Sequence, residues 1–214
     1  MFLTRLTLDP TAYRPERLLR DTQQLHAAIA ASFPEGPGGR VLWRIEPTGR
    51  SGQIQILIAS PHGPNESELW ERITTSDRAD TRNYGPLLDR LATGDRYRFR
   101  ATLNPVRGHN GRRTPIFDRA AQTAWLAEKL AVSGASINTH SPDLDSDEPD
   151  VQITATRNDR FTRAGSTGAV ELLKVTFDGG LTVTDPDTLR HSLCNGIGRA
   201  KGYGCGLLTL AAPT

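Results

Sequence analysis

The sequence predicts an α+β fold made of two related halves. The chain has 214 residues, enough for two small cores of about 100 residues each. Runs with the two-residue alternation of strands are interleaved with runs at helical spacing. In the first half these runs follow the order β-α-β-β-α-β, and the second half repeats that order more loosely. This order is the ferredoxin-like arrangement.

The first half starts with a strand over 2–8 that alternates apolar and polar residues. A helix follows it, beginning after Asp21, which with Gln24 resembles a capping box, and ending before Pro34. The rest of this half is predicted as strands over 41–46 and 53–59 joined by a hairpin at 47–52, a helix near 66–73 and a strand over 95–103.

The second half has a clear helix over about 118–132, closed by Gly134. Its other predicted elements are strands near 136–140, 151–156, 169–177 and 181–184, a helix from Pro186 and a last strand over 207–210. The predicted fold class is therefore α+β with two tandem ferredoxin-like (RRM-like) domains, 1–104 and 105–214. The stretch 104–114 joins them, and the acidic stretch 141–150 is predicted as a loop.

The composition excludes several classes of protein. The longest apolar run, 54–59, is far short of the ~20 residues of a membrane span, and the N-terminus alternates as a strand instead of forming a signal-peptide core. We therefore expect a cytoplasmic protein with no membrane partner. The two cysteines, Cys194 and Cys205, lack metal spacing and do not suggest a disulfide framework.

Arginine dominates the basic residues, contributing 23 of the 26. The planar guanidinium suits phosphate, but GC-rich codon usage explains the same bias equally well. Placement is more informative, because 96–119 holds seven arginines against one acid. Such asymmetry favours a nucleic-acid-binding face.

A glycine-rich segment at 196–206 permits close approach of the backbone to an anion, and Arg199 and Lys201 add positive charge. It matches neither the Walker pattern nor a dinucleotide fingerprint. A merely flexible turn is the alternative. The candidate ligand-binding glycines are Gly196, Gly198, Gly202 and Gly204.

His26 is the best-placed histidine. It lies in the first turns of the predicted helix, where the helix dipole favours the neutral imidazole that a general base requires. Alternatively it only borders the core. His62, His109, His140 and His191 form no metal-ligand pattern with one another or with the cysteines, so no metal or other cofactor is predicted.

Two basic loops complete the candidate site, and each arginine taken singly is explained by surface solubility. Together with the glycine segment they favour RNA as the ligand. The first loop contributes Arg107, Arg112 and Arg113, and the second contributes Arg157, Arg160 and Arg163.

With these residues in view, the sequence resembles the CRISPR-associated endoribonucleases of the CasE type, from end to end. The matching stretches are Phe2 to Leu6, Leu25-His26 with Phe33-Pro34, Arg98 to Pro105, Ala124 to Leu130, and Gly196 to Lys201 with Gly204 to Leu208. The resemblance implies two tandem ferredoxin-like domains and metal-independent cleavage of the repeat hairpin of precursor CRISPR RNA. It implies attack by a 2′-hydroxyl at the 3′ base of the hairpin, leaving 2′,3′-cyclic phosphate and 5′-hydroxyl ends. The family then stays on the stem-loop with the other subunits of the type I-E Cascade complex.

For the site, the resemblance implies that His26 is catalytic and that the glycine-rich loop holds RNA. The sequence departs from the family at Gln23, where tyrosine is usual, because an amide cannot exchange a proton. Tyr13, Tyr203 or Lys201 could supply the missing group. Arg199 is a second departure, since proline is usual there.

From these residues we expect an RNA-hairpin endonuclease in which His26 moves a proton and Lys201 steadies the charge on the phosphorane. Arg107, Arg112 and Arg113 would grip the stem, and the second arginine loop would grip its base. A non-catalytic RNA-hairpin-binding module of the same fold is the first alternative. A small-molecule phosphate-binding enzyme is the second.

Overall fold

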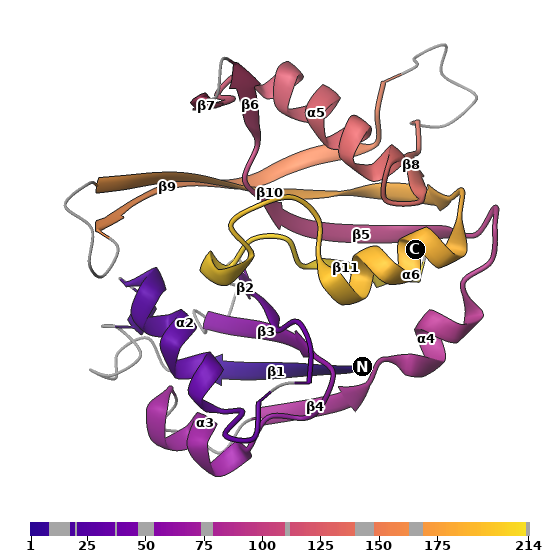
Figure 1. Ribbon diagram of the computed structural model, residues 1–214. Helices are drawn as coiled ribbons and strands as arrows, with labels where there is room; N and C mark the ends of the chain where they lie inside the picture. Colours follow the sequence, from indigo (N-terminus) through magenta and orange to yellow (C-terminus); the bar gives the residue numbers. More distant parts are fainter. Residues whose placement is uncertain are drawn as a thin grey trace.

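The computed structural model describes residues 1–8, 18–19, 21–36, 38–46, 54–73, 79–109, 112–139, 148–162 and 169–212 (Figure 1). The first part of the chain contains β1 (Phe2–Leu8), α2 (Thr22–Ala31), β2 (Leu42–Glu46), β3 (Ile54–Ser60), α3 (Glu66–Arg72), β4 (Ala79–Asn83) and α4 (Gly85–Arg90). The remainder contains β5 (Arg96–Leu103), β6 (Val106–His109), β7 (Arg112–Pro115), α5 (Arg119–Ala131), β8 (Ala135–Ile137), β9 (Val151–Thr162), β10 (Ala169–Val183), α6 (Pro186–Asn195), the 3-10 turn η1 (Lys201–Tyr203) and β11 (Leu208–Ala211).

The first sheet has the strand order β2-β3-β1-β4, and all its pairs are antiparallel. Strands taken in chain order thus lie side by side as second, third, first and fourth, which is the ferredoxin-like order. Helices α2 and α3 pack on one face through a core that includes Leu25, Ile29 and Leu69. Leu6 and Ile56 supply the sheet side of this core.

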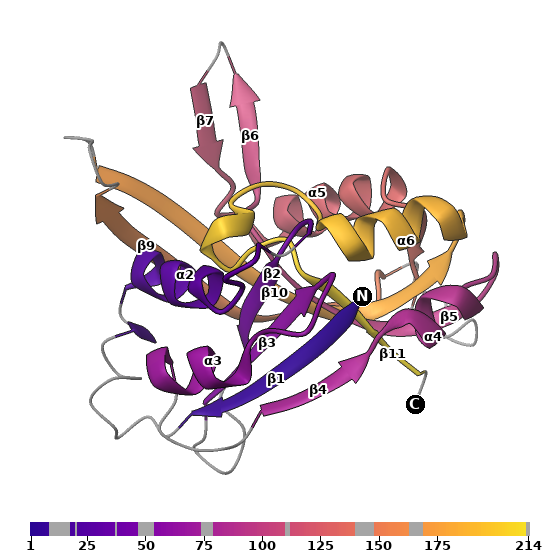
Figure 2. The same ribbon diagram turned by 60° about the horizontal axis from the view of Figure 1, so that its bottom comes forward.

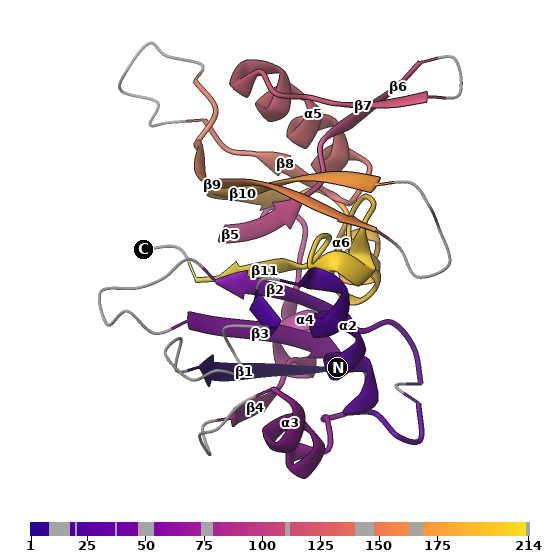
Figure 3. The same cartoon turned by 90° about the vertical axis from the view of Figure 1, so that its left-hand side faces the viewer.

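The second sheet repeats the same order, as β11-β5-β10-β8, with β9 paired alongside β10. Its core joins Leu126 of α5 and Leu189 of α6 to Phe99, Val175 and Phe177 of the sheet. The two sheets lie one above the other (Figure 3). The predicted fold class, two tandem ferredoxin-like units, is confirmed.

The boundary between the units differs from the prediction. We assigned 95–103 to the first unit, but β5 pairs with β10 and β11 in the second sheet. The fourth strand of the first sheet is β4, whose sequence Ala-Asp-Thr-Arg-Asn carries no apolar alternation. Because an edge strand can remain polar on both faces, periodicity alone could not detect it. The division between the sheets therefore falls between β4 and β5 rather than at 104.

One long strand, β10, replaces the two strands predicted at 169–177 and 181–184. Gly179 and Gly180, which lie between the two predicted strands, are inside it. A Cβ atom at Gly179 would be 2.3 Å from the carbonyl oxygen of Asp150, and one at Gly180 would be 2.4 Å from its carboxylate. These glycines therefore permit close packing rather than a turn.

The junction predicted at 104–114 is a two-stranded hairpin, β6 and β7, that projects from the body of the molecule (Figure 2). Strand β9 also extends well past the predicted 151–156. Both arginine loops of the sequence analysis are thus largely strand. Extended pairs of strands hold their side chains at fixed spacing, which a loop does not.

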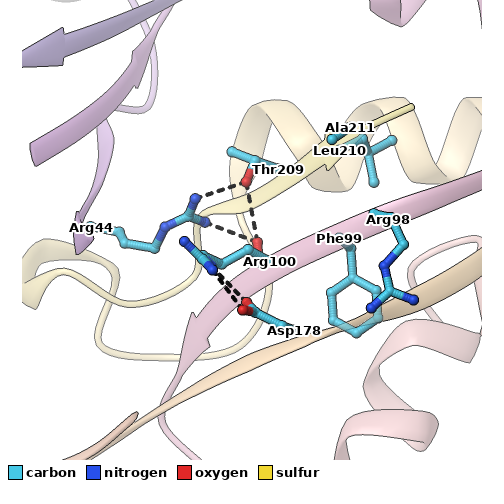
Figure 4. A pocket seen from close by; sticks show the side chains of 8 residues that line it. All are labelled: Arg44, Arg98, Phe99, Arg100, Asp178, Thr209, Leu210 and Ala211. Atoms are coloured by element: carbon cyan, nitrogen blue, oxygen red, sulfur yellow. Dashed lines mark hydrogen bonds and ion pairs between the residues drawn. The ribbon is translucent and has the colours of Figure 1, made fainter. Parts of the chain in front are cut away.

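Arg44 of β2 joins the two units, and its side chain is only 2% exposed. Its Nη1 donates to the carbonyl oxygen of Arg100 (2.9 Å) and its Nη2 donates to Oγ1 of Thr209 (2.8 Å) (Figure 4). Nη1 also donates to the carbonyl oxygen of Leu207 (3.2 Å). Glu46 accepts from both Arg44 and Arg100. The bonds of Arg44 to Arg100, Leu207 and Thr209 cross between the units, and Glu46 holds the Arg44 side chain in position for them. The network therefore fixes the relative orientation of the units.

Candidate functional site

Helix α2 presents His26 toward the second unit. Asp21 caps the helix by accepting hydrogen bonds from the backbone N–H groups of Gln23 (2.9 Å) and Gln24 (3.1 Å), as the capping pattern predicted. Leu25 and Ile29 are buried, whereas His26 beside them is exposed. Partial burial of the imidazole lowers the pKa of His26 below its usual 6.5. The ring is therefore neutral at pH 7, with burial as the cause.

The first turn of α2 is fastened to the second sheet by three buried side chains. Oγ1 of Thr22 donates to the carboxylate of Asp159 on β9 at 2.7 Å. Nζ of Lys174 on β10 lies 2.7 Å from the same carboxylate and 3.2 Å from the Thr22 hydroxyl. Thr22 is one helical turn before His26. The Thr22–Asp159–Lys174 cluster thus holds the catalytic candidate in place relative to the second unit.

The glycine-rich segment wraps against β2 and α2. Gly196 ends α6 with a φ of +77°, and Gly204 has a φ of +80°. A Cβ atom at Gly196 would lie 2.7 Å from Leu42, and one at Gly204 would lie 2.7 Å from the Trp43 ring. Both positions require glycine for backbone conformation and for packing between the units. Their predicted contact with RNA remains a prediction.

The centre of the segment lies at His26. A Cβ atom on Gly202 would be 3.5 Å from the imidazole carbon Cε1 and from Nε2, so Gly202 itself covers this face of the ring. The Tyr203 ring is tilted by 49° to the imidazole, with the ring centroids 6.4 Å apart. Among the groups that could replace the usual tyrosine, the structure therefore brings the Tyr203 ring to His26. Lys201 precedes Gly202 in the chain. Tyr13 lies outside the described residues.

Some backbone amides of the segment are occupied within the protein, and others are not. The Ile197 N–H donates to the carbonyl of Gly206 (2.9 Å), and the Gly206 N–H donates to that of Thr102 (2.8 Å). The amides of Gly198 and Arg199 donate to no residue in the described part of the chain. The outer turn of the segment is the part with donors left for an anion.

A pocket of about 530 Å³ opens beside His26. Residues of both units line it, and no carboxylate is among those that the structure describes. The lining residues are His26, Ile29, Ala30, Phe33, Gly39, Arg40, Val41, Asn195 and Gly202. Lys201 adjoins Gly202, and its pKa is lowered by burial and by the nearby charge of Arg40. The pocket is therefore positive, which suits an anionic ligand.

The predicted arginines fall into two groups. Arg107 and Arg113 are exposed on the β6–β7 hairpin, and Arg112 is on β7. Arg160 is exposed on β9, whereas Arg157 is partly engaged: it forms an ion pair with Asp159 and donates to the carbonyl of Leu19 at 3.3 Å. Arg163 lies outside the described residues. Two arginines of β5, in contrast, are used internally, since Arg98 pairs with Asp150 and Arg100 with Asp178.

Sequence reasoning missed Arg40, Asp159 and Lys174. A lysine within the apolar run Leu172 to Phe177 was the one available signal, because a buried ammonium requires a partner. Asp159 lies between two arginines in sequence, a pattern typical of an exposed residue.

The part of the chain that the structure describes contains no group of three or more side chains that could bind a metal ion. None of its helices combines the length and the apolar character of a membrane span.

Comparison with known proteins identifies the family. The profile of a family described as "CRISPR associated protein" matches residues 1–212. The chain belongs to this family. This CRISPR-associated protein is 29% identical over 224 residues to the CRISPR-associated endoribonuclease Cse3 of Thermus thermophilus, an alignment that covers 99% of the chain and 100% of the relative. It is 28% identical over 207 residues to the CRISPR system Cascade subunit CasE of Escherichia coli, with 90% and 92% covered.

A solved structure shares the whole architecture of this CRISPR-associated protein. The CRISPR endoribonuclease Cse3 bound to a 19-nucleotide RNA superposes with a TM-score of 0.84 at 27% sequence identity, covering 99% of this chain and 100% of that one. The similarity to Cse3 and CasE confirms the resemblance to the CasE type that the sequence indicated. The protein is a CasE-type member of the type I-E family.

Proposed function

We propose that the protein is a metal-independent endoribonuclease that binds the repeat hairpin of precursor CRISPR RNA and cuts at its 3′ base. The observation that carries the proposal is the approach of Gly202 from the second unit to the imidazole of His26 from the first, beside a pocket that Arg40 makes positive. Lys201 is next to Gly202 in the chain. The similarity to endoribonucleases named for this activity over the full chain supports the proposal. A protein that acts on CRISPR RNA would work in the cytoplasm.

In this proposal the neutral imidazole of His26 accepts the proton of the 2′-hydroxyl on the nucleotide before the cut. The 2′ oxygen forms a bond to the adjacent phosphorus, and the bond from phosphorus to the 5′ oxygen breaks. The products carry a 2′,3′-cyclic phosphate and, once the departing oxygen is protonated, a 5′-hydroxyl. A lowered pKa keeps the imidazole in its proton-accepting form at pH 7.

Negative charge grows on the phosphorane oxygens during this step, and the second unit supplies the groups that stabilise it. The Lys201 ammonium and the free amides of Gly198 and Arg199 are donors of the kind that act in an oxyanion hole, and all three belong to the described part of the chain. Arg107, Arg112 and Arg113 on the projecting hairpin would contact the phosphates of the stem. Arg157, Arg160 and Arg163 would contact the base of the hairpin.

After cleavage the protein remains on the stem-loop and joins the type I-E Cascade complex, in line with the CasE relative, a named Cascade subunit. A binding-only module would share the fold, the basic strands and this assembly. It would differ only in leaving the RNA intact.

The test is cleavage of a repeat hairpin in excess EDTA under single-turnover conditions, with the product ends identified by mass spectrometry. We expect a 2′,3′-cyclic phosphate product from the wild-type protein. His26→Ala should bind the hairpin within a few-fold of wild type and lose cleavage by about 10²–10⁴-fold. Intact RNA with the wild-type protein would favour the binding-only module, and full cleavage by His26→Ala would exclude the proposed role of the histidine.

A further inference from the structure

Among the residues described as lining the His26 pocket, Arg40 is the one with a full positive charge on its side chain. It lies on the loop immediately before β2, and its side chain is exposed. It forms no hydrogen bond or ion pair with any residue that the structure describes. Arg44 of β2 and both Arg98 and Arg100 of β5 are paired with carboxylates, so Arg40 differs from them in being available to a ligand.

A second unpaired cation lies close by. The Lys201 side chain also forms no hydrogen bond or ion pair among the described residues. Arg40 belongs to the first unit and Lys201 to the second, and the charge of Arg40 is felt at the Lys201 ammonium. Because neither cation has a carboxylate partner among the described residues, both are available to an anionic ligand.

The pocket is also larger than a single phosphate needs. Its volume of about 530 Å³ falls within the range of sites that bind small organic ligands. Ile29, Phe33 and Val41 give it an apolar wall, and the imidazole of His26 and the backbone of Gly202 close one side. An apolar wall suits a nucleobase or a ribose, and an arginine at the edge suits a phosphate.

We propose that Arg40 binds the backbone phosphate adjoining the scissile one, and that the pocket beside His26 holds the nucleotide between these two phosphates. This inference rests on the proposed function, because it assumes that the scissile phosphate lies at His26 and Lys201. It assigns Arg40 a role in fixing the RNA backbone for in-line attack. Correct alignment of the reacting atoms contributes to the rate without changing the chemistry.

Three variants test the role of Arg40 at saturating protein. Arg40→Ala should lower the single-turnover cleavage rate about 10–100-fold, and Arg40→Lys should restore part of it, because the charge is kept and the planar fork is lost. Arg82→Ala is the matched control: it removes an exposed arginine of β4 in the same unit and should cleave within about twofold of wild type. Circular dichroism should show all three folded. Cleavage by Arg40→Ala at the wild-type rate would overturn the proposal.

A second measurement identifies the phosphate. The two phosphates flanking the scissile one are neutralised in turn as methylphosphonates, each with a 2′-O-methyl group on the nucleotide whose 3′ oxygen bears the linkage. The reference RNA carries that 2′-O-methyl group with an ordinary phosphate. Neither 2′-O-methyl group removes the attacking 2′-hydroxyl, which belongs to the nucleotide whose 3′ oxygen bears the scissile linkage, so the cleavage rate is the readout for both RNAs.

Neutralising the phosphate that Arg40 binds should slow cleavage by the wild-type protein. The same change should have little further effect on the rate of Arg40→Ala, since that interaction is already lost. Independent, multiplying losses at both positions would contradict the assignment. If the wild-type protein cleaves the hairpin and Arg40→Ala cleaves it at the same rate, this inference alone is refuted. An uncleaved hairpin with wild-type protein would refute the proposed function itself, so the two failures are distinguishable.

Discussion

At the scale of single residues, the proposed mechanism depends on a neutral histidine. Burial against Gly202 on one side and exposure on the other leave the His26 ring accessible while lowering its pKa. A lowered pKa means that the imidazole loses its proton at a lower pH than a free histidine does. The proton-accepting form is then the main species through the neutral range.

The pH dependence of cleavage follows from this shift. With protein below saturation, the second-order rate constant should rise with pH, bend at an apparent pKa below 6.5 and stay level through pH 7, because that constant reports the free enzyme. His26→Ala should lose this rising limb. A midpoint clearly above 6.5 that His26→Ala removes would contradict the lowered pKa of His26 in the free protein.

Two glycines of the same segment should respond differently to alanine. At Gly204 the φ of +80° and the 2.7 Å approach to the Trp43 ring both oppose a Cβ atom. Gly204→Ala should therefore destabilise the protein by about 1–3 kcal/mol in urea unfolding. Gly202→Ala meets only ordinary contact, 3.5 Å from the imidazole. It should fold normally and slow cleavage, because the added methyl group would stand against Nε2 and Cε1 of the imidazole. Equal loss of stability in both variants would contradict the assigned packing.

The sequence predicted His26 and the glycine segment because each has a local signature, a capped helix and a cluster of glycines. Arg40 has none: it follows two glycines in a polar stretch, and its neighbour Lys201 is distant in sequence. Which glycines serve packing was also beyond the sequence. That distinction depends on Leu42 and Trp43, which only the fold brings to the segment.

At the scale of elements, the position of α2 depends on a buried charge pair on two strands of the other unit. Asp159 and Lys174 face the first turn of the helix and both bond Thr22. Burial alone would raise the pKa of Asp159, but the Lys174 ammonium and the Thr22 hydroxyl outweigh it and hold that pKa below its usual value. The carboxylate thus stabilises the folded state in its charged form.

Removing one charge of this cluster should lower the free energy of unfolding by more than removing both charges. Lys174→Met leaves a buried carboxylate short of its main partner, and we expect a loss of about 3–5 kcal/mol in urea unfolding. Adding Asp159→Leu should recover part of that loss. Arg72→Ala, which breaks the exposed Arg72–Glu68 pair on α3, is the control and should leave the unfolding midpoint nearly unchanged.

Acid should weaken the same cluster. Because the pKa of Asp159 is lowered on folding, its contribution is complete above the unfolded value of about 3.9 and is lost as pH falls through the folded value. The double variant should therefore lose less stability than the wild type does between pH 5 and strongly acid solution. A difference that stays constant with pH would show that the carboxylate is not responsible.

At the scale of the whole molecule, two ferredoxin-like units are locked face to face and the site forms where they meet. Most strands of both sheets could be predicted from the periodicity of the sequence, apart from the polar edge strand β4. The mutual orientation of the sheets could not, because it depends on side chains such as Arg44 that bond backbone carbonyls of the other unit. Such contacts join residues that are far apart in the sequence and share no sequence pattern that would predict their pairing.

Joining of the units is also what makes the site complete. His26 comes from the first unit with one wall of the pocket, and Lys201 comes from the second with the glycine segment. Among the described residues, neither unit alone carries a proton acceptor, a charge stabiliser and a pocket. In the proposed mechanism, residues of both units therefore act on one phosphate in one step.

A double-mutant cycle on the single-turnover cleavage rate tests that claim most directly. His26→Ala, Lys201→Ala and the double variant are compared with wild type at saturating protein, in EDTA. If both side chains act on the same transition state, the double variant should be little slower than the slower single variant. Losses that multiply in the double variant, or a Lys201→Ala variant that cleaves at the wild-type rate, would contradict a site shared by the two units.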